Sequence, residues 1–514
     1  MNVYDWKIAS YPSKKTKDWL LLTLAKNRGL SSKKDLDAFL NPKFEQILDV
    51  KINNIQKAIA RIDKAIKKGE KIIKKLASSG FEVAIVGGAV RQMLAREKIT
   101  DWDLTTNAKP EEIQKLFAKS FYNNRFGTVG VAIPDGQIAQ ITTYRTEEKY
   151  TDKRHPDVIV WGKSLEEDLK RRDFTINAMA LRLSKTSGKF EFIDPFDGKG
   201  DLDNKIIRTV GNPNERFKED ALRLLRAVRF ATVLYFSIEK QTQTAIKKNA
   251  GLLSKISGER IRDELFKIIE SDNAADGILL LKELGLLTII LPELEICFSV
   301  EQKSPKRHHI FDVGTHCVLS LKNCPSGDTT VRFATLLHDI GKAKVANVTE
   351  EGVRTFYNHE VVGGYVAKKI ADRLHLSREQ KDKLYKLVRF HQFTVDEKQT
   401  DKALRRFIRN IGLENIEDMM DLRIGDRLGG GLQQPESWRL KLFRQRIKEV
   451  LKKPFTVADL KINGNDVMKT LGIKPGPEVG RILNELFEEV ADDKTKNTKE
   501  YLLKRLKSFK ANKV

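Results

Sequence analysis

The stretch FEVAIVGGAVRQMLAREKITDWD, residues Phe81 to Asp103, decides the fold of the central part of this chain. Its apolar run Val83–Val86 is typical of a buried strand, and Ala89–Arg96 has the composition of a helix. Gly87 and Gly88, which lie between them, would let backbone amides approach a phosphate at the helix N-terminus. The stretch therefore predicts a strand, a glycine turn and a helix in direct succession.

Two aspartates follow that helix in the sequence Asp101-Trp102-Asp103. In a strand, residues i and i+2 point to the same face, so both carboxylates could hold one divalent cation. A glycine pair alone is usually only a turn. Combined with Arg91 and the two aspartates at this spacing, it predicts a site for metal-assisted nucleotidyl transfer.

The composition indicates a large basic protein. The chain has 514 residues and a formal net charge of +24, which is typical of proteins that bind a polyanion such as nucleic acid. A lysine-rich solvated surface would give the same charge. The length is sufficient for several domains with a sizeable core.

The sequence also bears on compartment. Three cysteines without paired spacing fit a reducing cytoplasm. No segment resembles a signal peptide, and no apolar run approaches the ~20 residues of a spanning helix. We therefore expect a soluble cytoplasmic protein without a membrane partner.

Five regions are expected along the chain: a helical N-terminal appendage at 1–75, a head at 76–208, a helical neck and body at 209–300, a histidine-rich helical domain at 301–454 and a helical tail at 455–514. The sequence LLTLAKNRGLSSKKDLDAFLNP in the appendage resembles the N-terminal segment of RecJ-type exonucleases. The paired-aspartate motifs of that family are absent, so no nuclease activity is implied, and an unrelated helical appendage fits equally well.

Within the head, local patterns predict further elements. We expect a helix at Pro110–Ser120 and strands at Gly127–Ile133 and Gln137–Tyr144. The charged segment Arg145–Gly162 lacks apolar periodicity and is predicted to be a mobile loop. Asp194–Val210 is predicted to consist of turns.

The order of motifs in residues 80–300 resembles one known family. GGAVRQMLAREKITDWDL, FGTVGVAI, RRDFTINAMAL, DPFDGKGDL and EDALRLLRAVRFA closely resemble the class II tRNA nucleotidyltransferases, which are the CCA-adding enzymes related to bacterial poly(A) polymerases. The segment GNDVMKTLGIKPGPEVGRILNELFEEV resembles the C-terminal tRNA-binding end of bacterial members. The resemblance implies that the tail and other basic helices bind tRNA.

The resemblance also implies roles for single residues in the head. Asp101 and Asp103 are the expected catalytic residues and Mg²⁺ ligands, because carboxylate oxygens suit that ion. The expected contacts to the nucleotide are Gly87, Gly88, Arg91, Arg172, Asp173 and Asn177. Asp173 and Asn177 would lie near the ribose, although helix capping explains these two residue types equally well.

Four charged residues recur every three positions in the segment Glu219–Arg229. These residues, which we expect to form one ridge on a helix, are Asp220, Arg223, Arg226 and Arg229. An aspartate can accept from an exocyclic amine while an arginine donates to the adjacent ring nitrogen. Cytosine and adenine share that edge, so the ridge is predicted to select CTP and ATP; an RNA-facing basic helix is the simpler interpretation.

Two positions depart from the family pattern. Gln92 stands where members usually have aspartate, and Gln140 stands where they usually have a carboxylate. An amide oxygen can bind Mg²⁺ but brings no charge. Gln140 therefore weakens the case for a third metal-linked carboxylate, unless Glu147 takes over the role.

A second set of residues resembles the HD superfamily of metal phosphohydrolases. Seven of the eight histidines lie after residue 300, and LLHDIGK at Leu336–Lys342 is the most specific motif. The expected ligands of a divalent transition metal of unknown identity are His316, His338, Asp339, His359, His391 and Asp426. His308 and His309 are doubtful ligands, and we expect His155 and His375 not to bind metal.

Together these features predict an α+β multidomain protein. A polymerase-β-like nucleotidyltransferase head with a small mixed sheet would be followed by an all-α neck and body, a helical HD domain and a helical tail. The leading hypothesis is template-independent addition of CMP and AMP from CTP and ATP to tRNA 3′ ends, with an HD phosphohydrolase acting on RNA 3′ or 2′,3′-cyclic phosphates.

Several alternatives fit the same residues. They are a poly(A) polymerase, an enzyme that adds only A or only CC, an HD phosphohydrolase with a weakened head, and a non-catalytic RNA-binding scaffold. By resemblance to the family, in which the CC-adding type lacks part of the segment corresponding to Arg145–Gly162, the presence of that segment favours CCA or A addition. The sequence does not determine the oligomeric state.

Overall fold

A computed structural model describes residues 71–123, 128–133, 137–148, 158–161, 164–184, 188–302, 311–393, 400–451 and 457–511. The chain divides into two compact units. The first unit extends to Arg145 and also includes Trp161–Glu167 and Met179–Ile193. The second unit comprises Thr146–Val160, Asp168–Ala178 and Asp194–Val514.

The first unit is built on a seven-stranded mixed sheet with the strand order β3-β4-β5-β2-β1-β8-β9. The strands are β1 (Val83–Val86), β2 (Trp102–Thr106), β3 (Ser120–Asn123), β4 (Thr128–Ala132), β5 (Ile138–Thr143), β8 (Ala180–Leu183) and β9 (Phe190–Ile193). β1 pairs antiparallel with both β2 and β8, whereas β2 and β5 run parallel.

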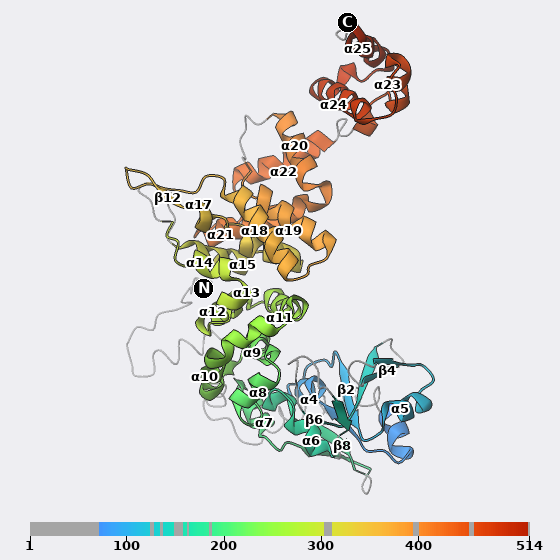
Figure 1. Cartoon of the computed structure of the whole chain (residues 1–514), viewed down its shortest axis with the longest axis vertical. Helices are drawn as coiled ribbons and strands as arrows, with labels where there is room; N and C mark the ends of the chain where they lie inside the picture. Colours follow the sequence, from blue (N-terminus) through green and yellow to red (C-terminus); the bar gives the residue numbers. More distant parts are fainter. Residues whose placement is uncertain are drawn as a thin grey trace, which may run out of the picture. The chain divides into compact units, whose positions relative to one another are not determined.

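The central strand and its helix follow the sequence pattern. All four residues of β1 are buried, which confirms the predicted strand at Val83–Val86. The predicted helix after the glycines is α4 (Gly88–Leu94), and α5 (Pro110–Leu116) begins with a proline and two acids as expected. Figure 1 shows α4, α5, β2 and β4 close together in this part of the chain.

Three expectations for the head are wrong in part. The second helix ends at Leu116 rather than Ser120, and Ser120 already belongs to β3. The predicted loop Arg145–Gly162 contains β6 (Arg145–Glu148) and β7 (Val158–Trp161), which form a two-stranded sheet. The predicted turns at Asp194–Val210 include α7 (Gly198–Asp203), whose first amides donate to the Asp194 carboxylate.

The second unit is mainly helical, as expected. After α6 (Leu165–Lys170) and the short 3-10 helix η1 (Thr175–Asn177), the neck and body contain α8 (Pro213–Glu219), α9 (Leu222–Leu234), α10 (Lys240–Asn249), α11 (Gly258–Glu270), α12 (Ala274–Glu283), α13 (Leu287–Ile290) and α14 (Pro292–Cys297). Short strands β10 (Ile206–Ile207) and β11 (Ser237–Ile238) pair in parallel within this region.

The described residues of the histidine-rich region form helices and a hairpin of β12 (Asn347–Val348) and β13 (Arg354–Thr355). Its helices are α15 (Val313–Lys322), α16 (Thr329–Leu337), α17 (Lys342–Val345), α18 (His359–Arg373), α19 (Arg378–Phe390), α20 (Asp401–Ile411), α21 (Ile416–Gly429) and α22 (Trp438–Leu451). Cys297, Cys317 and Cys324 are buried free thiols, as the sequence predicted.

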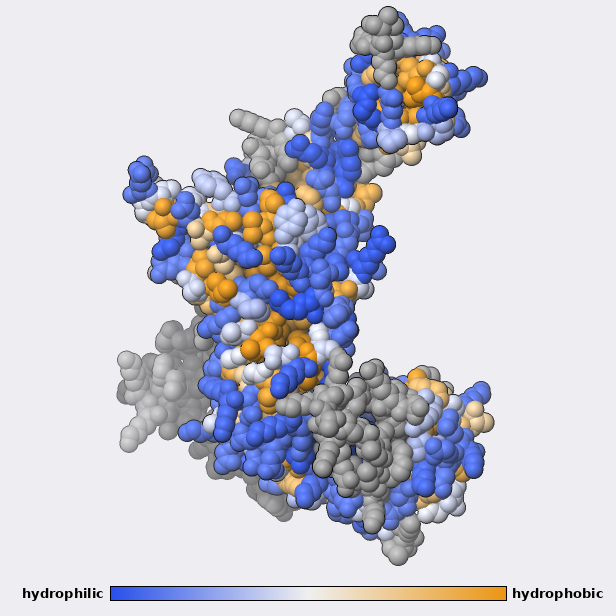
Figure 2. Space-filling view, viewed as in Figure 1, coloured by the Kyte–Doolittle hydropathy of each residue, from blue (hydrophilic) through white to orange (hydrophobic). Residues whose placement is uncertain are grey.

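The C-terminal helices have a hydrophobic core of their own. α23 (Gly464–Leu471), α24 (Pro477–Asp492) and α25 (Lys499–Ala511) bury a shared cluster that includes Val467, Leu486 and Leu502. Figure 2 shows hydrophobic residues of this part surrounded by hydrophilic side chains.

One buried ion pair connects two segments of the second unit. Asp173 is 8% exposed, and its Oδ2 lies 2.6 Å from Nη2 of Arg226 on α9. Burial alone would raise the pKa of the Asp173 carboxyl, but the Arg226 guanidinium and a bond from Asn177 hold it well below its usual range. The charged carboxylate is therefore the form that stabilises this packing.

The backbone at Gly87 gives a testable prediction for the glycine turn. Gly87 has φ 67° and ψ −134°, a conformation that L-residues rarely adopt. Gly87→Ala should destabilise the head by about 1–3 kcal/mol, which thermal unfolding followed by circular dichroism would detect. Gly88→Ala is the matched control, because its added Cβ would meet nothing closer than 3.7 Å. Equal losses in both variants would contradict this account.

The Asp173 ion pair gives a second prediction. Asp173→Asn keeps the shape but leaves the Arg226 charge without its carboxylate, so the unfolding temperature at neutral pH should fall by several degrees. Because the folded-state pKa lies below the ordinary 3.8, the stabilisation is present above that pH and is lost as the pH falls below it.

The difference between wild type and Asp173→Asn should therefore be constant near neutral pH and narrow below about pH 4. Asp203→Asn is the control, since the Asp203 side chain is 62% exposed and pairs only at the surface with Lys199. A difference that widens in acid would refute the assigned role.

Candidate functional site

The two head aspartates lie at one end of the mixed sheet. Asp103 is half-buried in β2, whereas Asp101 is exposed and immediately precedes the strand, so the strand geometry considered for the pair applies only to Asp103. The antiparallel register from Val83↔Thr106 to Ile85↔Leu104 brings the end of β1 beside the start of β2. The Gly87–Gly88 turn therefore lies at the same sheet end as both carboxylates.

The donor chemistry at this sheet end fits Mg²⁺. Trp102, between the two aspartates, is only 2% exposed, whereas the carboxylates on either side are accessible to solvent. Alternation along β2 puts Trp102 on the core side and the Asp103 carboxylate on the other, and Asp101, which precedes the strand, is exposed to solvent. Oxygen ligands that leave room for water and substrate phosphates are those that Mg²⁺ prefers.

Neither glutamine departure removes the carboxylate pair. Gln140 is exposed and lies opposite Asp103 in the register of the parallel strands β2 and β5. The residue beside Asp103 therefore carries an amide side chain rather than a carboxylate. Gln92 bonds to Thr100 rather than pointing to a metal position. The side chain of Glu147 lies outside the described residues.

The predicted triphosphate contacts surround the glycine turn. Gly87 is the N-cap of α4, and Arg91 lies in the last turn of that seven-residue helix. A Cβ on Gly88 would lie 3.7 Å from Nη2 of Arg91, so the guanidinium lies beside the turn. A backbone turn and a guanidinium together suit the binding of phosphate oxygens.

The residues of the RRDFTIN motif are held by each other and by neighbouring carboxylates. Nη2 of Arg172 pairs with Asp168 at 3.2 Å, and Nη1 donates to the carbonyl of Asn177 at 3.3 Å. Asn177 in turn donates to the Asp173 carboxylate at 3.2 Å, and that carboxylate accepts from the amide of Phe174. Asp173 and Asn177 thus have the local structural role that was the alternative to contact with ribose.

The predicted ridge is only partly a helix face. Arg223, Arg226 and Arg229 lie on α9, but Asp220 lies in extended backbone before the helix, so the prediction of a four-residue helical ridge is wrong for Asp220. Its Oδ1 accepts from the amide of Leu222. Aspartate favours such a position because its side chain satisfies a free amide at a helix start.

Each ridge side chain also has an ion-pair partner. Asp220 pairs with Arg260 at 2.8 Å, and Arg223, which is 8% exposed, pairs with Glu219 at 2.6 Å. Arg229 pairs with Glu264 at 2.6 Å and lies 4.0 Å from the ring centre of Phe230. The ridge is therefore part of a charged network within the second unit.

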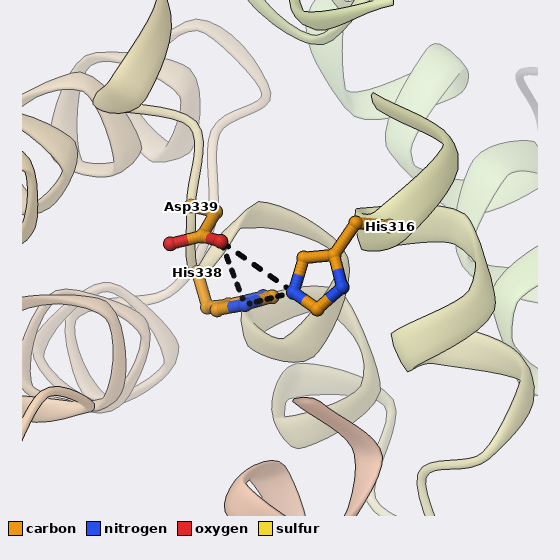
Figure 3. Close-up of side chains that lie close together, drawn as sticks. All are labelled: His316, His338 and Asp339. Carbon is orange, nitrogen blue, oxygen red and sulfur yellow. Dashed lines mark hydrogen bonds and ion pairs between the residues drawn. The ribbon is translucent and has the colours of Figure 1, made fainter. Parts of the chain in front are cut away.

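The six predicted ligands of the HD site come together in the second unit. They are contributed by five helices or their ends: His316 in α15, His338 and Asp339 after α16, His359 at the start of α18, His391 after α19 and Asp426 in α21. Figure 3 shows His316, His338 and Asp339 pointing toward one another.

The ligand atoms form two groups that share one carboxylate. Nε2 of His316 lies 3.2 Å from Oδ1 of Asp426, and Nε2 of His338 lies 3.4 Å from Oδ2 of Asp339. In the other group, Nε2 of His359 and His391 lie 3.3 and 3.6 Å from Oδ1 of Asp339. Asp339 therefore presents one oxygen to each group.

Hydrogen bonds orient three of these imidazoles. Nδ1 of His338, His359 and His391 each lies 2.8 Å from a backbone carbonyl oxygen, which can only accept. Nδ1 therefore donates, so that the lone pair lies on Nε2 whenever one of these rings is neutral, as it is when it binds a metal ion. Because Nε2 of His359 and His391 face each other at 3.3 Å, a shared cation would satisfy both.

The electrostatics of the cluster also favour a cation. Burial alone would lower the pKa of His338, but the adjacent Asp339 carboxylate outweighs it and raises the pKa to about 10. Asp339 and Asp426 are themselves held well below their usual pKa range despite burial. Buried carboxylates and imidazoles in this arrangement fit a transition-metal centre.

Sequence reasoning missed one residue of this cluster. Nζ of Lys342 lies 2.6 Å from Oδ2 of Asp339 and donates to Oε1 of Gln302 at 2.7 Å. The spacing of three between Asp339 and Lys342 in LLHDIGK was the available signal. His375 lies outside the cluster near Glu259, as expected, and His155, His308 and His309 lie outside the described residues.

Within the part of the chain that the structure describes, no helix has the length and hydrophobicity needed to cross a bilayer.

Successive parts of the chain match three family models. Residues 83–208 match the Poly A polymerase head domain, 235–297 match an RNA and SrmB-binding site of polymerase A, and 363–506 match tRNA nucleotidyltransferase domain 2. Four of the six predicted metal ligands, His316, His338, Asp339 and His359, lie between the last two ranges.

Whole proteins are also similar to this chain. The CCA-adding enzyme of Ligilactobacillus salivarius is 34% identical over 457 residues, which cover 89% of this chain and 100% of that enzyme. The CCA-adding enzyme of Pediococcus pentosaceus is 34% identical over 427 residues, covering 83% of this chain and 93% of that enzyme.

A solved structure is similar over nearly the same range. The crystal structure of the Bacillus stearothermophilus CCA-adding enzyme in complex with CTP has a TM-score of 0.64 and 28% identity, and the match covers 87% of this chain and 98% of that one. The predicted polymerase-β-like head followed by a helical body is thereby confirmed. Because one relative is 34% identical along its whole length, the chain belongs to the CCA-adding enzyme family.

Proposed function

We propose that this chain adds CMP and AMP from CTP and ATP to the 3′ ends of tRNA, without a nucleic-acid template and with Mg²⁺. The observation that carries the proposal is the position of Asp101 and Asp103 at the same sheet end as the Gly87–Gly88 turn. Family membership and the CTP complex of the Bacillus stearothermophilus relative support it.

The residues of the head suggest how this chemistry would proceed. Asp101 and Asp103 would hold Mg²⁺, which when bound would lower the pKa of the attacking hydroxyl and neutralise charge on the phosphates. Gly88 and Arg91 would hold the triphosphate through backbone and guanidinium N–H groups. The tRNA 3′-oxygen then bonds to the α-phosphorus as the bond to pyrophosphate breaks, and the hydroxyl proton is released.

Asp220 and Arg223 are the proposed readers of the base. Each carboxylate oxygen of Asp220 has two lone pairs, so bonds from Leu222 and Arg260 still leave room for an exocyclic amine. Arg172, Arg226 and Arg229 supply further positive charge in the second unit. Asp173 and Asn177 are proposed near the ribose, beside the structural bonds that they make.

We assign regional roles on the same basis. The head at 76–208 would carry transfer, the neck and body at 209–300 nucleotide selection and RNA binding, and the tail at 455–514 tRNA binding. The tail exposes lysines suited to an RNA backbone: Lys461, Lys469, Lys474, Lys494, Lys499, Lys504 and Lys507. A tRNA substrate also suits the expected cytoplasmic location, and the role of 1–75 and the oligomeric state stay unassigned.

Poly(A) synthesis is the main alternative within the class, because the head matches the Poly A polymerase head domain. Addition of A alone uses the same residues.

The HD cluster favours a second activity in the same chain. The region 301–454 would be a metal phosphohydrolase domain acting on RNA 3′ or 2′,3′-cyclic phosphates. The clustered histidines and aspartates would hold transition-metal ions, which when bound would activate water against a phosphoester. Asp339 would orient both groups of ligands through its two oxygens, and Lys342 would offer a positive charge beside it.

The transferase proposal predicts a specific loss on substitution. Purified protein, Mg²⁺ and a tRNA transcript lacking its last three nucleotides should incorporate label from CTP alone, and from ATP once CMP has been added. Asp101→Ala should lower incorporation by about a hundredfold or more, as removal of one preorganised charge does in other enzymes. Glu97→Ala, which removes a nearby exposed carboxylate, is the control. Full incorporation by Asp101→Ala would exclude the assigned site.

The phosphohydrolase proposal predicts metal content as well as activity. Protein purified without chelator should contain transition metal by elemental analysis, and His338→Ala and the isosteric Asp426→Asn should both lower that content and the hydrolysis of 2′,3′-cyclic AMP. His375→Ala is the matched control, since the His375 side chain is 58% exposed. Unchanged metal content in both cluster variants would argue against an HD metal centre.

A further inference from the structure

Three hydrogen bonds connect Gln92, Thr100 and Asp101 in the head. The amide of Thr100 donates to Oε1 of Gln92 at 3.2 Å, and Nε2 of Gln92 donates to Oγ1 of Thr100 at 3.1 Å. Oγ1 of Thr100 lies 3.0 Å from Oδ2 of Asp101. A single glutamine of α4 thus holds both the main chain and the side chain of the residue before Asp101.

The direction of this chain of bonds follows from the chemistry of its ends. The Thr100 amide can only donate, which makes the glutamine atom facing it the oxygen and the other atom the NH₂ group. Because the NH₂ group donates to Oγ1, the hydroxyl proton of Thr100 is free to donate to Asp101. The Asp101 carboxylate can only accept this hydrogen bond. The donations therefore run in one direction, from Gln92 to Thr100 and from Thr100 to Asp101.

Asp101 needs such support because the sheet does not provide it. The register of β2 with β5 begins at Trp102↔Ala139, and the register with β1 extends from Thr106 to Leu104. Asp101 itself is exposed and precedes the ladder, whereas Asp103 lies within it. The orientation of the Asp101 carboxylate therefore depends on the segment before the strand.

We propose that Gln92 and Thr100 are positioning residues that fix the Asp101 carboxylate for metal binding, an inference that rests on the proposed transferase function. It gives Gln92 a role at the position where the family resemblance leads one to expect aspartate. A carboxylate at residue 92 could not donate to Oγ1 and would compete for the hydroxyl proton, so Thr100 would no longer be directed toward Asp101.

The closing experiment uses the full chain and isosteric variants. Thr100→Val removes only the hydroxyl, Gln92→Met removes the amide at similar length, and Thr100→Ser keeps the hydroxyl. Gln114→Ala, an exposed glutamine of α5, is the matched control. Two quantities are measured: the Mg²⁺ concentration for half-maximal CMP incorporation, and Mn²⁺ binding with CTP but without tRNA, followed by electron paramagnetic resonance. The Mn²⁺ ions bound by the head are identified as those that wild type binds and Asp101→Ala does not.

Thr100→Val and Gln92→Met should each raise the half-maximal Mg²⁺ concentration and weaken head Mn²⁺ binding by about threefold to tenfold, because each removes or misdirects the one hydrogen bond that Thr100 donates to Asp101. Incorporation should recover at saturating Mg²⁺. Thr100→Ser and Gln114→Ala should resemble wild type. Because the bonds act in series, the double variant should be no worse than either single variant.

Wild-type metal dependence in Thr100→Val and Gln92→Met would overturn the inference, provided that Asp101→Ala is inactive. A loss that persists at saturating Mg²⁺ with a lowered unfolding temperature would also overturn it, because it would show a purely structural role. If Asp101→Ala keeps full incorporation and Mn²⁺ binding, the proposed function of the carboxylate pair fails instead.

Discussion

The antiparallel hydrogen bonding of β1 to β2 is the constraint on which the head depends. It joins a buried four-residue strand to the strand that carries Asp103, and it fixes their register. Since antiparallel strands meet end to start, the glycine turn after β1 and the carboxylates at the start of β2 share one sheet end. A parallel arrangement of the same two strands would put them at opposite ends.

The second unit uses a different physical device for its candidate metal centre. The head offers two solvent-accessible carboxylates, one just before β2 and one within it. The histidine cluster instead brings together imidazoles and carboxylates from five helices or their ends. Asp339 connects the two groups of ligands because each of its oxygens faces different histidines. Oxygen donors suit Mg²⁺ and imidazole donors suit transition metals, so the two sites differ in the ion they would select.

Much of this arrangement follows from local sequence patterns. The strand Val83–Val86 is confirmed residue for residue. The six predicted metal ligands of the histidine-rich region also lie close together. Residue spacing gave a wrong prediction of secondary structure where a residue type also has a common local role outside a helix. Asp220 keeps the three-residue spacing of the ridge, but it lies in extended backbone before the helix. Its side chain accepts a hydrogen bond from the amide of Leu222 at the helix start.

Other features depend on tertiary contacts that the sequence does not show. The partners of Arg223 and Asp173 come from residues up to about fifty positions away, as in the Asp173–Arg226 pair. Gln92 was recognised only as a departure from a family pattern. Its bonds to Thr100 depend on how the segment after α4 turns back, and no periodicity encodes that turn.

The central claim is most directly tested by sequencing the 3′ ends of a tRNA transcript lacking CCA after incubation with the full chain, Mg²⁺ and all four nucleotides. The account predicts that most ends carry CCA and that addition then stops. The added nucleotides should be C and A, because Asp220 and Arg223 are proposed to recognise the amine-plus-acceptor edge that only these two bases present. Ends extended by long runs of A, or ends left unextended, would contradict it.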